Sequence, residues 1–310
     1  MTAFDCTQSI PAGYRGYFEY LQGKGVTHFK VPLSWAQLLP TGLPSQPQPA
    51  VVRCYKAWLN QLVEVGLQPL VILHGSAVPE ELRMRYGGWE SPELGQMFQQ
   101  YAEFAFLEFG DLVQSWVILS RLDELKSAEL QNALHAHASV QQHYHQLFPG
   151  FVGKQYIAGH HLIKAHAEAW HLYIDKYRAR QGGLISITIN SDWVEPRNPH
   201  KQEDTDAALW ILQDRSWIEQ GSSWLKITPF GFRRILNFIK KDYGNPPVYV
   251  TENGISERGA VDLNDVHRVV FLGLELLSGV AEVALYFMFA FALSSVVAAI
   301  FGGCRLVETK

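Results

Sequence analysis

The stretch Val248-Tyr249-Val250-Thr251-Glu252-Asn253-Gly254 is the most informative part of this 310-residue chain. Its first four residues are β-branched or aromatic, which favours a short strand, and the Asn-Gly pair after Glu252 indicates a turn. The preceding segment, 230–243, has the apolar periodicity of an amphipathic helix. A short strand that follows such a helix and ends at a carboxylate is typical of a βα unit.

The same alternation of strand and helix extends toward the N-terminus, where a Pro-rich loop at 40–49 and helix-ending glycines separate the elements. Strands are predicted at 28–35, 68–73, 114–119, 184–190 and 248–251, and helices at 51–65, 97–109, 156–178 and 230–243. Strands that alternate with helices predict an α/β fold around a parallel sheet.

Composition and charge narrow the class of protein. The chain is 47% hydrophobic and 18% charged, with a formal net charge of −4 and no basic stripe, so no nucleic-acid partner is expected. Its three cysteines, Cys6, Cys54 and Cys304, lie far apart and lack metal-ligand spacing. They predict neither a zinc site nor a disulfide framework.

The C-terminal run 283–304 contains no charged residue. It is as long as a helix needs to be to cross a bilayer, about 20 residues, and we predict a single transmembrane helix there; the alternative is a buried core helix. Arg305 and Lys310 favour a cytoplasmic location for the tail 305–310. Residues 1–6 lack the pattern of a signal peptide, so the helix would insert as a tail anchor or the true N-terminus is missing.

Several motifs in a fixed order resemble glycoside hydrolase family 1, the family of β-glucosidases and klothos. Residues 247–254 resemble its nucleophile strand, and 28–35 resemble its second strand. Further matching segments are 87–89, 101–104, 109–111, 159–166, 181–186 and 228–234. The resemblance implies the (β/α)8 TIM barrel, but no match to the family's first, sixth and eighth strands is found. The barrel is therefore expected to be incomplete.

The resemblance also suggests how the chain is organised. Residues 1–148 resemble a degenerate repeat of a lactase-type member, and 149–267 resemble a catalytic-type repeat that lacks its middle. The segment 283–304 is similar to a membrane anchor, followed by the tail 305–310. The chain is interpreted as a mosaic or truncated form.

Retaining glycosidases need two carboxyl groups about 5–5.5 Å apart, one as nucleophile and one as acid/base. By resemblance Glu252 takes the nucleophile position; the alternative is a surface glutamate after an edge strand. The acid/base position is Arg121, preceded by Ser120 where the family has Asn. An arginine cannot donate a proton at neutral pH. Asp123 or Glu124 are substitute acids by proximity, or else solvated residues at a helix start.

The sugar-binding positions also depart from the family. Strand three of the family ends in Tyr-His-Trp, and His74-Gly75-Ser76 stands there, so His74 is a candidate sugar ligand or a loop histidine without that role. Lys30 replaces an arginine near the nucleophile and keeps its charge without its two-pronged geometry. Asn253 is carried over as a substrate-binding position. The family's reaction needs no metal and no organic cofactor.

Three hypotheses follow. The chain is a membrane-anchored β-glycosidase acting on β-glucosides or β-galactosides, a catalytically inactive glycosidase-like binding module, or a truncated fragment without function. Whether it is an enzyme is left open by Arg121. Resemblance to lactase-type members predicts the apical plasma membrane as its location.

Overall fold

The computed structural model describes residues 14–74, 78–120, 151–190, 200, 229–252, 285–287 and 297–300. The chain divides into two compact units. The described part of unit 1 comprises 14–74, 78–120 and 151–188, and the remaining described residues form unit 2. Unit 1 therefore contains residues from both sides of the repeat boundary predicted near 148. That boundary concerns sequence ancestry and stays a prediction.

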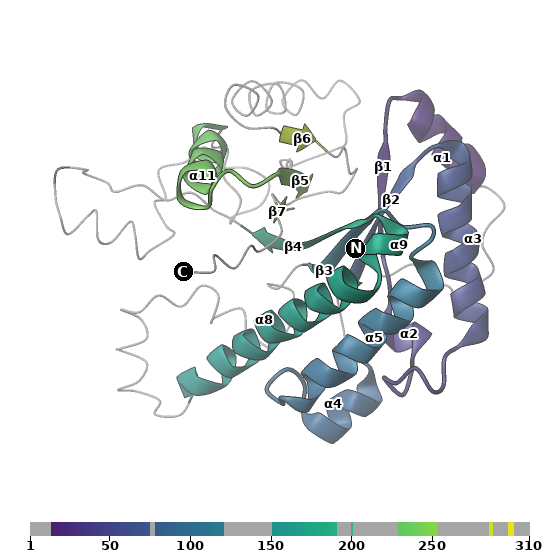
Figure 1. Ribbon diagram of the computed structural model, residues 1–310, viewed down its shortest axis with the longest axis vertical. Helices are drawn as coiled ribbons and strands as arrows, with labels where there is room; N and C mark the ends of the chain where they lie inside the picture. The colour runs from purple at the N-terminus through teal and green to yellow at the C-terminus, as the bar shows by residue number, and fades with distance from the viewer. Residues whose placement is uncertain are drawn as a thin grey trace, which may run out of the picture. The chain divides into compact units, whose positions relative to one another are not determined.

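Unit 1 is built on a parallel sheet with the strand order β1-β2-β3-β4 (Figure 1). The strands are β1 (His28–Pro32), β2 (Gln68–His74), β3 (Ser115–Leu119) and β4 (Leu184–Asn190). Neighbouring parallel strands that are consecutive in the chain require crossover connections, which helices provide here. The predicted βα organisation is confirmed in this unit.

Helices cover one face of this sheet (Figure 1). They are α1 (Tyr14–Gly23), α2 (Trp35–Leu38), α3 (Pro49–Val65), α4 (Glu80–Tyr86), α5 (Glu93–Phe109), α8 (Phe151–Lys176) and α9 (Arg178–Gln181). Pro49 begins α3, where the backbone N–H that proline lacks would have no partner within the helix. Gly66 ends the helix in the left-handed region, with φ 88°.

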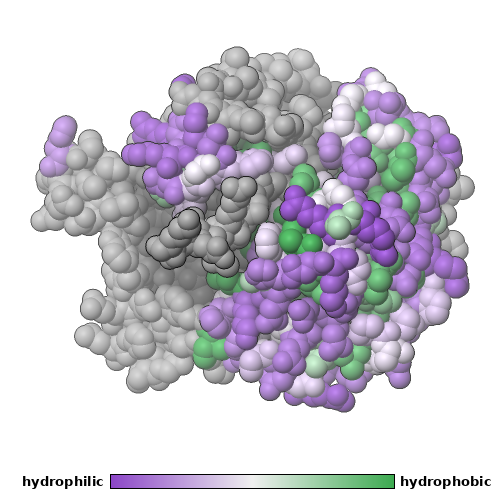
Figure 2. Space-filling model, viewed as in Figure 1, coloured by the Kyte–Doolittle hydropathy of each residue, from purple (hydrophilic) through white to green (hydrophobic). Residues whose placement is uncertain are grey.

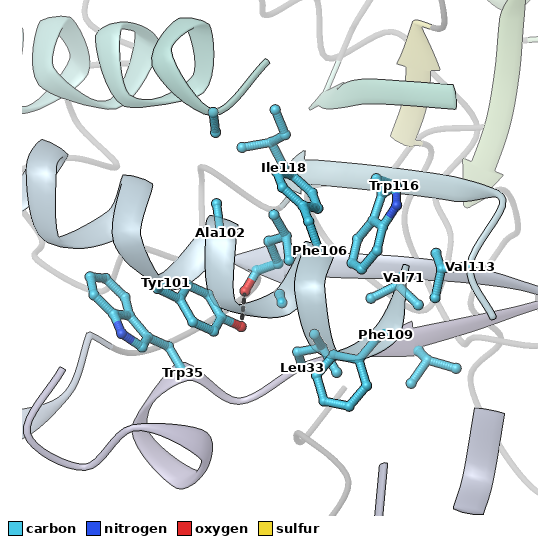
Figure 3. Packing of buried hydrophobic residues seen from close by; sticks show 14 of the residues in the cluster. Leu33, Trp35, Val71, Tyr101, Ala102, Phe106, Phe109, Val113, Trp116 and Ile118 are labelled. Carbon is cyan, nitrogen blue, oxygen red and sulfur yellow. Dashed lines mark hydrogen bonds between the residues drawn. The ribbon is translucent and has the colours of Figure 1, made fainter. Parts of the chain in front are cut away.

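Phe106 of α5 lies at the centre of the packing between helices and sheet (Figure 3). Its ring centroid is 5.1 Å from that of Trp116 on β3 and 4.9 Å from that of Tyr173 on α8. At the end of α8, Lys176 pairs with Glu103 of α5 at 3.1 Å. Helix α8 therefore shares one core with the elements that precede residue 120. The outer surface over these helices is mostly hydrophilic, with small hydrophobic areas between (Figure 2).

Unit 2 contains α11 (Pro229–Asp242) and the strand β5 (Val248–Glu252). Leu236 and Ile239 of the helix pack with Val248 and Val250 of the strand in a small buried cluster. Strand β5 pairs in parallel with β6 (Leu285–Phe287) and antiparallel with β7 (Val297–Ile300). The helix and strand predicted around Glu252 are thus present.

The predicted transmembrane helix over 283–304 differs from the structure where the structure describes it. Residues 285–287 and 297–300 are strands, and their backbones pair with β5. A run of β-branched and aromatic residues can satisfy its backbone in a sheet as well as in a helix, which apolarity alone does not decide. No helix in the described part of the chain is both long enough and apolar enough to span a membrane. The tail 305–310 lies outside the described residues.

Cys54 on α3 is disulfide-bonded, whereas the spacing of the three cysteines predicted no disulfide framework. The other two cysteines, Cys6 and Cys304, lie outside the described residues. Separation along the sequence does not report proximity in the fold, so a single disulfide is compatible with this spacing.

Candidate functional site at the carboxyl end of the sheet

His74 is the last residue of β2, so it is part of a strand and not of a loop. Its side chain is only 3% exposed and packs edge-on against Trp89, with 5.3 Å between ring centroids, and against Phe98 of α5, with 6.0 Å. Burial lowers the pKa of His74 to about 4, because the charged imidazolium would lose its hydration. The structure thus places this predicted sugar ligand as a neutral ring among aromatic side chains.

Lys30 lies on β1, two residues before the strand ends, and is 8% exposed. In the parallel register it stands opposite Leu70 of β2. Leu70 precedes His74 by four residues, which corresponds to about 13 Å along the strand. The structure therefore does not place the backbones of Lys30 and His74 at the same level of the sheet.

Ser120 follows β3 at the rim of the sheet, and its backbone N–H donates to the His74 oxygen at 2.8 Å. Ser120 is buried. The acid/base position Arg121 and the substitute acids Asp123 and Glu124 lie outside the described residues. At this position the structure describes the end of β3 as far as Ser120.

Glu252 is the last residue of β5, at the carboxyl end of its strand, and pairs with Val297 of β7. This is the end at which barrel enzymes carry their catalytic groups. Asn253 lies outside the described residues. Glu252 therefore ends a strand, as predicted, while its role stays a prediction.

Two buried tyrosines of the helix layer reach the backbone at the rim of the sheet. The Tyr55 hydroxyl of α3 accepts from the Ser34 N–H at 3.1 Å, just after β1. The Tyr101 hydroxyl of α5 donates to the Leu73 oxygen at 3.0 Å, one residue before His74. Sequence reasoning matched Tyr101 to the family only as part of a motif and gave it no role.

Trp89 also belongs to a segment that resembles the family, Gly87-Gly88-Trp89, and no function was predicted for it. Both glycines have positive φ, 78° and 101°, which places the indole beside His74. The Trp89 oxygen accepts from His161 Nδ1 at 3.0 Å, and its buried indole N–H has no hydrogen-bond partner among the residues that the structure describes. The signal in the sequence was the glycine pair before a large aromatic residue.

Within the described ranges, no group of three or more His, Cys, Asp and Glu side chains could hold a metal ion. Near the carboxyl ends of β1 to β4, the buried polar residues that the structure describes include Ser34, His74, Ser120 and Thr188.

Comparisons with known proteins agree on one family. The model of glycosyl hydrolase family 1 matches residues 14–213 and 204–283. Human lactase/phlorizin hydrolase is 33% identical over 81% of this chain, and klotho of Macaca fascicularis is 36% identical over 81%. The chain spans only 17% of the former and 30% of the latter.

Solved structures show the same fold at low sequence identity. The β-glucosidase of Trichoderma harzianum has a TM-score of 0.75 at 20% identity, covering 92% of this chain and 78% of that one. A β-glucosidase of Thermotoga maritima in complex with deoxynojirimycin has a TM-score of 0.70 at 19% identity, covering 90% and 76%.

Proposed function

Because the chain belongs to glycoside hydrolase family 1, we propose that it is a β-glycoside-binding module with little or no hydrolytic turnover. The family assignment confirms the resemblance predicted from the motifs. Turnover, substrate and partners do not follow from membership alone, since the chain spans a small part of these relatives.

The observation that carries the proposal is the end of β3. This strand ends at Leu119, and the Ser120 N–H donates a hydrogen bond to the neighbouring strand. The next residue is Arg121, at the position where the family has its acid. An arginine guanidinium stays protonated at neutral pH and cannot exchange a proton with a leaving group. A lone carboxylate at Glu252 could attack a sugar, but departure of the leaving group would be unassisted.

Binding and turnover are tested separately. We expect the chain to bind deoxynojirimycin, the ligand of the Thermotoga structure, in calorimetry, and to leave cellobiose and lactose, whose alcohol leaving groups need a proton, unhydrolysed. Rapid hydrolysis that is lost in Glu252→Gln would show instead that the chain is an active β-glycosidase. Absence of both binding and hydrolysis would reject the proposal.

A variant that restores the acid/base residue tests whether its absence is the reason for the missing hydrolysis. Ser120→Asn combined with Arg121→Glu places the family's residues at the end of β3, and general acid catalysis contributes about 10²–10⁴-fold in rate. We expect measurable hydrolysis in this double variant and none when Glu252→Gln is added. The matched control is Ser120→Asn alone, which supplies no acid.

Membrane attachment through 283–304, at the apical plasma membrane and with 305–310 in the cytoplasm, stays a prediction. It is supported by the uncharged length of the run. Carbonate extraction of cell membranes tests it, since an integral protein stays in the pellet. Release into the supernatant would favour the pairing of β6 and β7 with β5 as the role of this segment.

A further inference from the structure

The ladder between β2 and β3 is interrupted at Leu73. Paired residues run from Leu70 with Ser115 to Ile72 with Val117, skip Leu73, and resume at His74 with Leu119. On β2 the Ile72 oxygen accepts from Leu33 beyond β1, whereas the His74 oxygen accepts from Ser120 beyond β3. In a regular strand, carbonyls two residues apart point to the same neighbour. The strand therefore reverses its hydrogen-bonding side between Ile72 and His74.

Side chains reverse with the backbone. Leu70 and Ile72 are buried but do not belong to the core cluster beneath the helices, while Val71 and Leu73 do. By alternation His74 should share the face of Ile72, yet its ring contacts Trp89 and Phe98 of that cluster.

The neighbouring strand shows the same reversal. On β3, Val117 lies outside the core cluster, and the consecutive residues Ile118 and Leu119 both belong to it. Two successive side chains on one face cannot arise from regular alternation. The side chains at the carboxyl ends of β2 and β3 thus change face together, at the level of Leu73.

Tyr101 occupies the point of reversal. Its hydroxyl donates to the Leu73 oxygen, the carbonyl at which the ladder is interrupted (Figure 3). The ring is fully buried and stacks on Trp35 at 5.1 Å with an interplanar angle of 9°. Burial raises the pKa of Tyr101 well above its ordinary value, so the hydroxyl remains a donor at neutral pH.

We propose that Tyr101 is a positioning residue, whose hydroxyl holds the Leu73 carbonyl out of the sheet ladder and thereby sets which face the rim residues of β2 and β3 take. A carbonyl that lost this donor would be free to accept from β3, as its regular neighbours do. The regular ladder would then turn His74 toward the opposite face of the sheet. The consequence for ligand affinity rests on the proposed function.

The test removes one oxygen atom. Tyr101→Phe keeps the ring and its stacking but loses the bond to Leu73. The matched control is Tyr173→Phe, because the buried Tyr173 hydroxyl forms no well-aligned hydrogen bond among the described residues. For Tyr101→Phe we expect amide exchange at Ser120 to accelerate about 3- to 10-fold, the range of one lost hydrogen bond, and deoxynojirimycin affinity to change by a similar factor. Tyr173→Phe should change neither.

Unchanged Ser120 exchange in Tyr101→Phe would overturn the inference, and so would altered exchange with unaltered affinity. If the wild-type protein binds no deoxynojirimycin, the proposed function fails, while the exchange measurement still decides the role of Tyr101. A measurement on the wild-type protein tests the reversal even if the variant does not fold. Nuclear Overhauser effects from the His74 ring should reach Trp89 and Phe98, and contacts to Leu70 or Ile72 instead would reject the reversal.

Discussion

The Nδ1 atom of His161 lies 3.0 Å from the main-chain oxygen of Trp89 and joins helix α8 to the loop before α5. A carbonyl oxygen only accepts, so Nδ1 carries the proton in this bond. The contact links two segments that lie 72 positions apart in the chain and orients the tryptophan whose indole packs on His74.

Loss of this bond should weaken unit 1 modestly. His161→Phe keeps a planar ring without the donor, and we expect the free energy of unfolding to fall by about 1 kcal/mol. His160→Phe is the matched control, since His160 is the exposed neighbour on the same helix. Urea titration followed by tryptophan fluorescence measures both. Equal effects of the two variants would contradict a specific role for His161.

Phe106 should be the more costly position to truncate. It is fully buried between Trp116 and Tyr173, so Phe106→Ala should lower the free energy of unfolding by about 3–5 kcal/mol. Leu107→Ala, at the exposed next position, should change it by less than about 0.5 kcal/mol. Denaturant unfolding followed by circular dichroism distinguishes them. A small loss for Phe106→Ala would mean that α8 does not share this core.

Gly183 and Tyr173 should show strong coupling. A Cβ atom at Gly183 would collide with the Tyr173 hydroxyl and stand 3.2 Å from the Gln114 oxygen. Gly183→Ala should therefore cost about 1–3 kcal/mol, as overpacking does. Removing the hydroxyl with Tyr173→Phe should recover most of that loss, and a double-mutant cycle of thermal unfolding measures the recovery. Simple additivity would show that backbone contacts and not the hydroxyl limit the site.

Stability should fall below neutral pH through His74. Its pKa is about 4 in the folded chain and about 6.5 when unfolded. Its contribution is complete above pH 6.5 and is lost as pH falls to 4, because only the unfolded state gains the proton. The loss is up to about 3 kcal/mol. Urea unfolding between pH 7 and 4 should show a shallower decline in His74→Phe, and equal slopes would contradict this.

The secondary structure of unit 1 was largely predictable because its strands and long helices have strong periodicity. The predicted strand 28–35 was too long, since β1 ends at Pro32 and Ser34 begins a new helix by accepting from the Gln37 N–H at 3.2 Å. Helices α1 and α4 were not predicted. Each spans ten residues or fewer and is stabilised by its packing more than by its own pattern.

The candidate site was predictable as a set of positions and not as an arrangement. Motif order identified Glu252 and Arg121, and strand propensity predicted the strand that ends at Glu252. The levels of Lys30 and His74 depend on the register between β1 and β2, which no local pattern encodes. The face taken by His74 depends on a bond from Tyr101, which comes from a helix 27 positions later.

The reversal of β2 and β3 at the level of Leu73 has a consequence for how relatives are compared with this chain. Counting in twos from the base of each strand assigns His74 and Leu119 to the face of the sheet opposite the helices, one step out of phase with where they lie. Substitutions at these strand ends that are transferred from a relative by such counting would enter the hydrophobic layer instead. Grafting of a sugar pocket onto this scaffold should therefore begin from the hydrogen-bond pattern of each strand end.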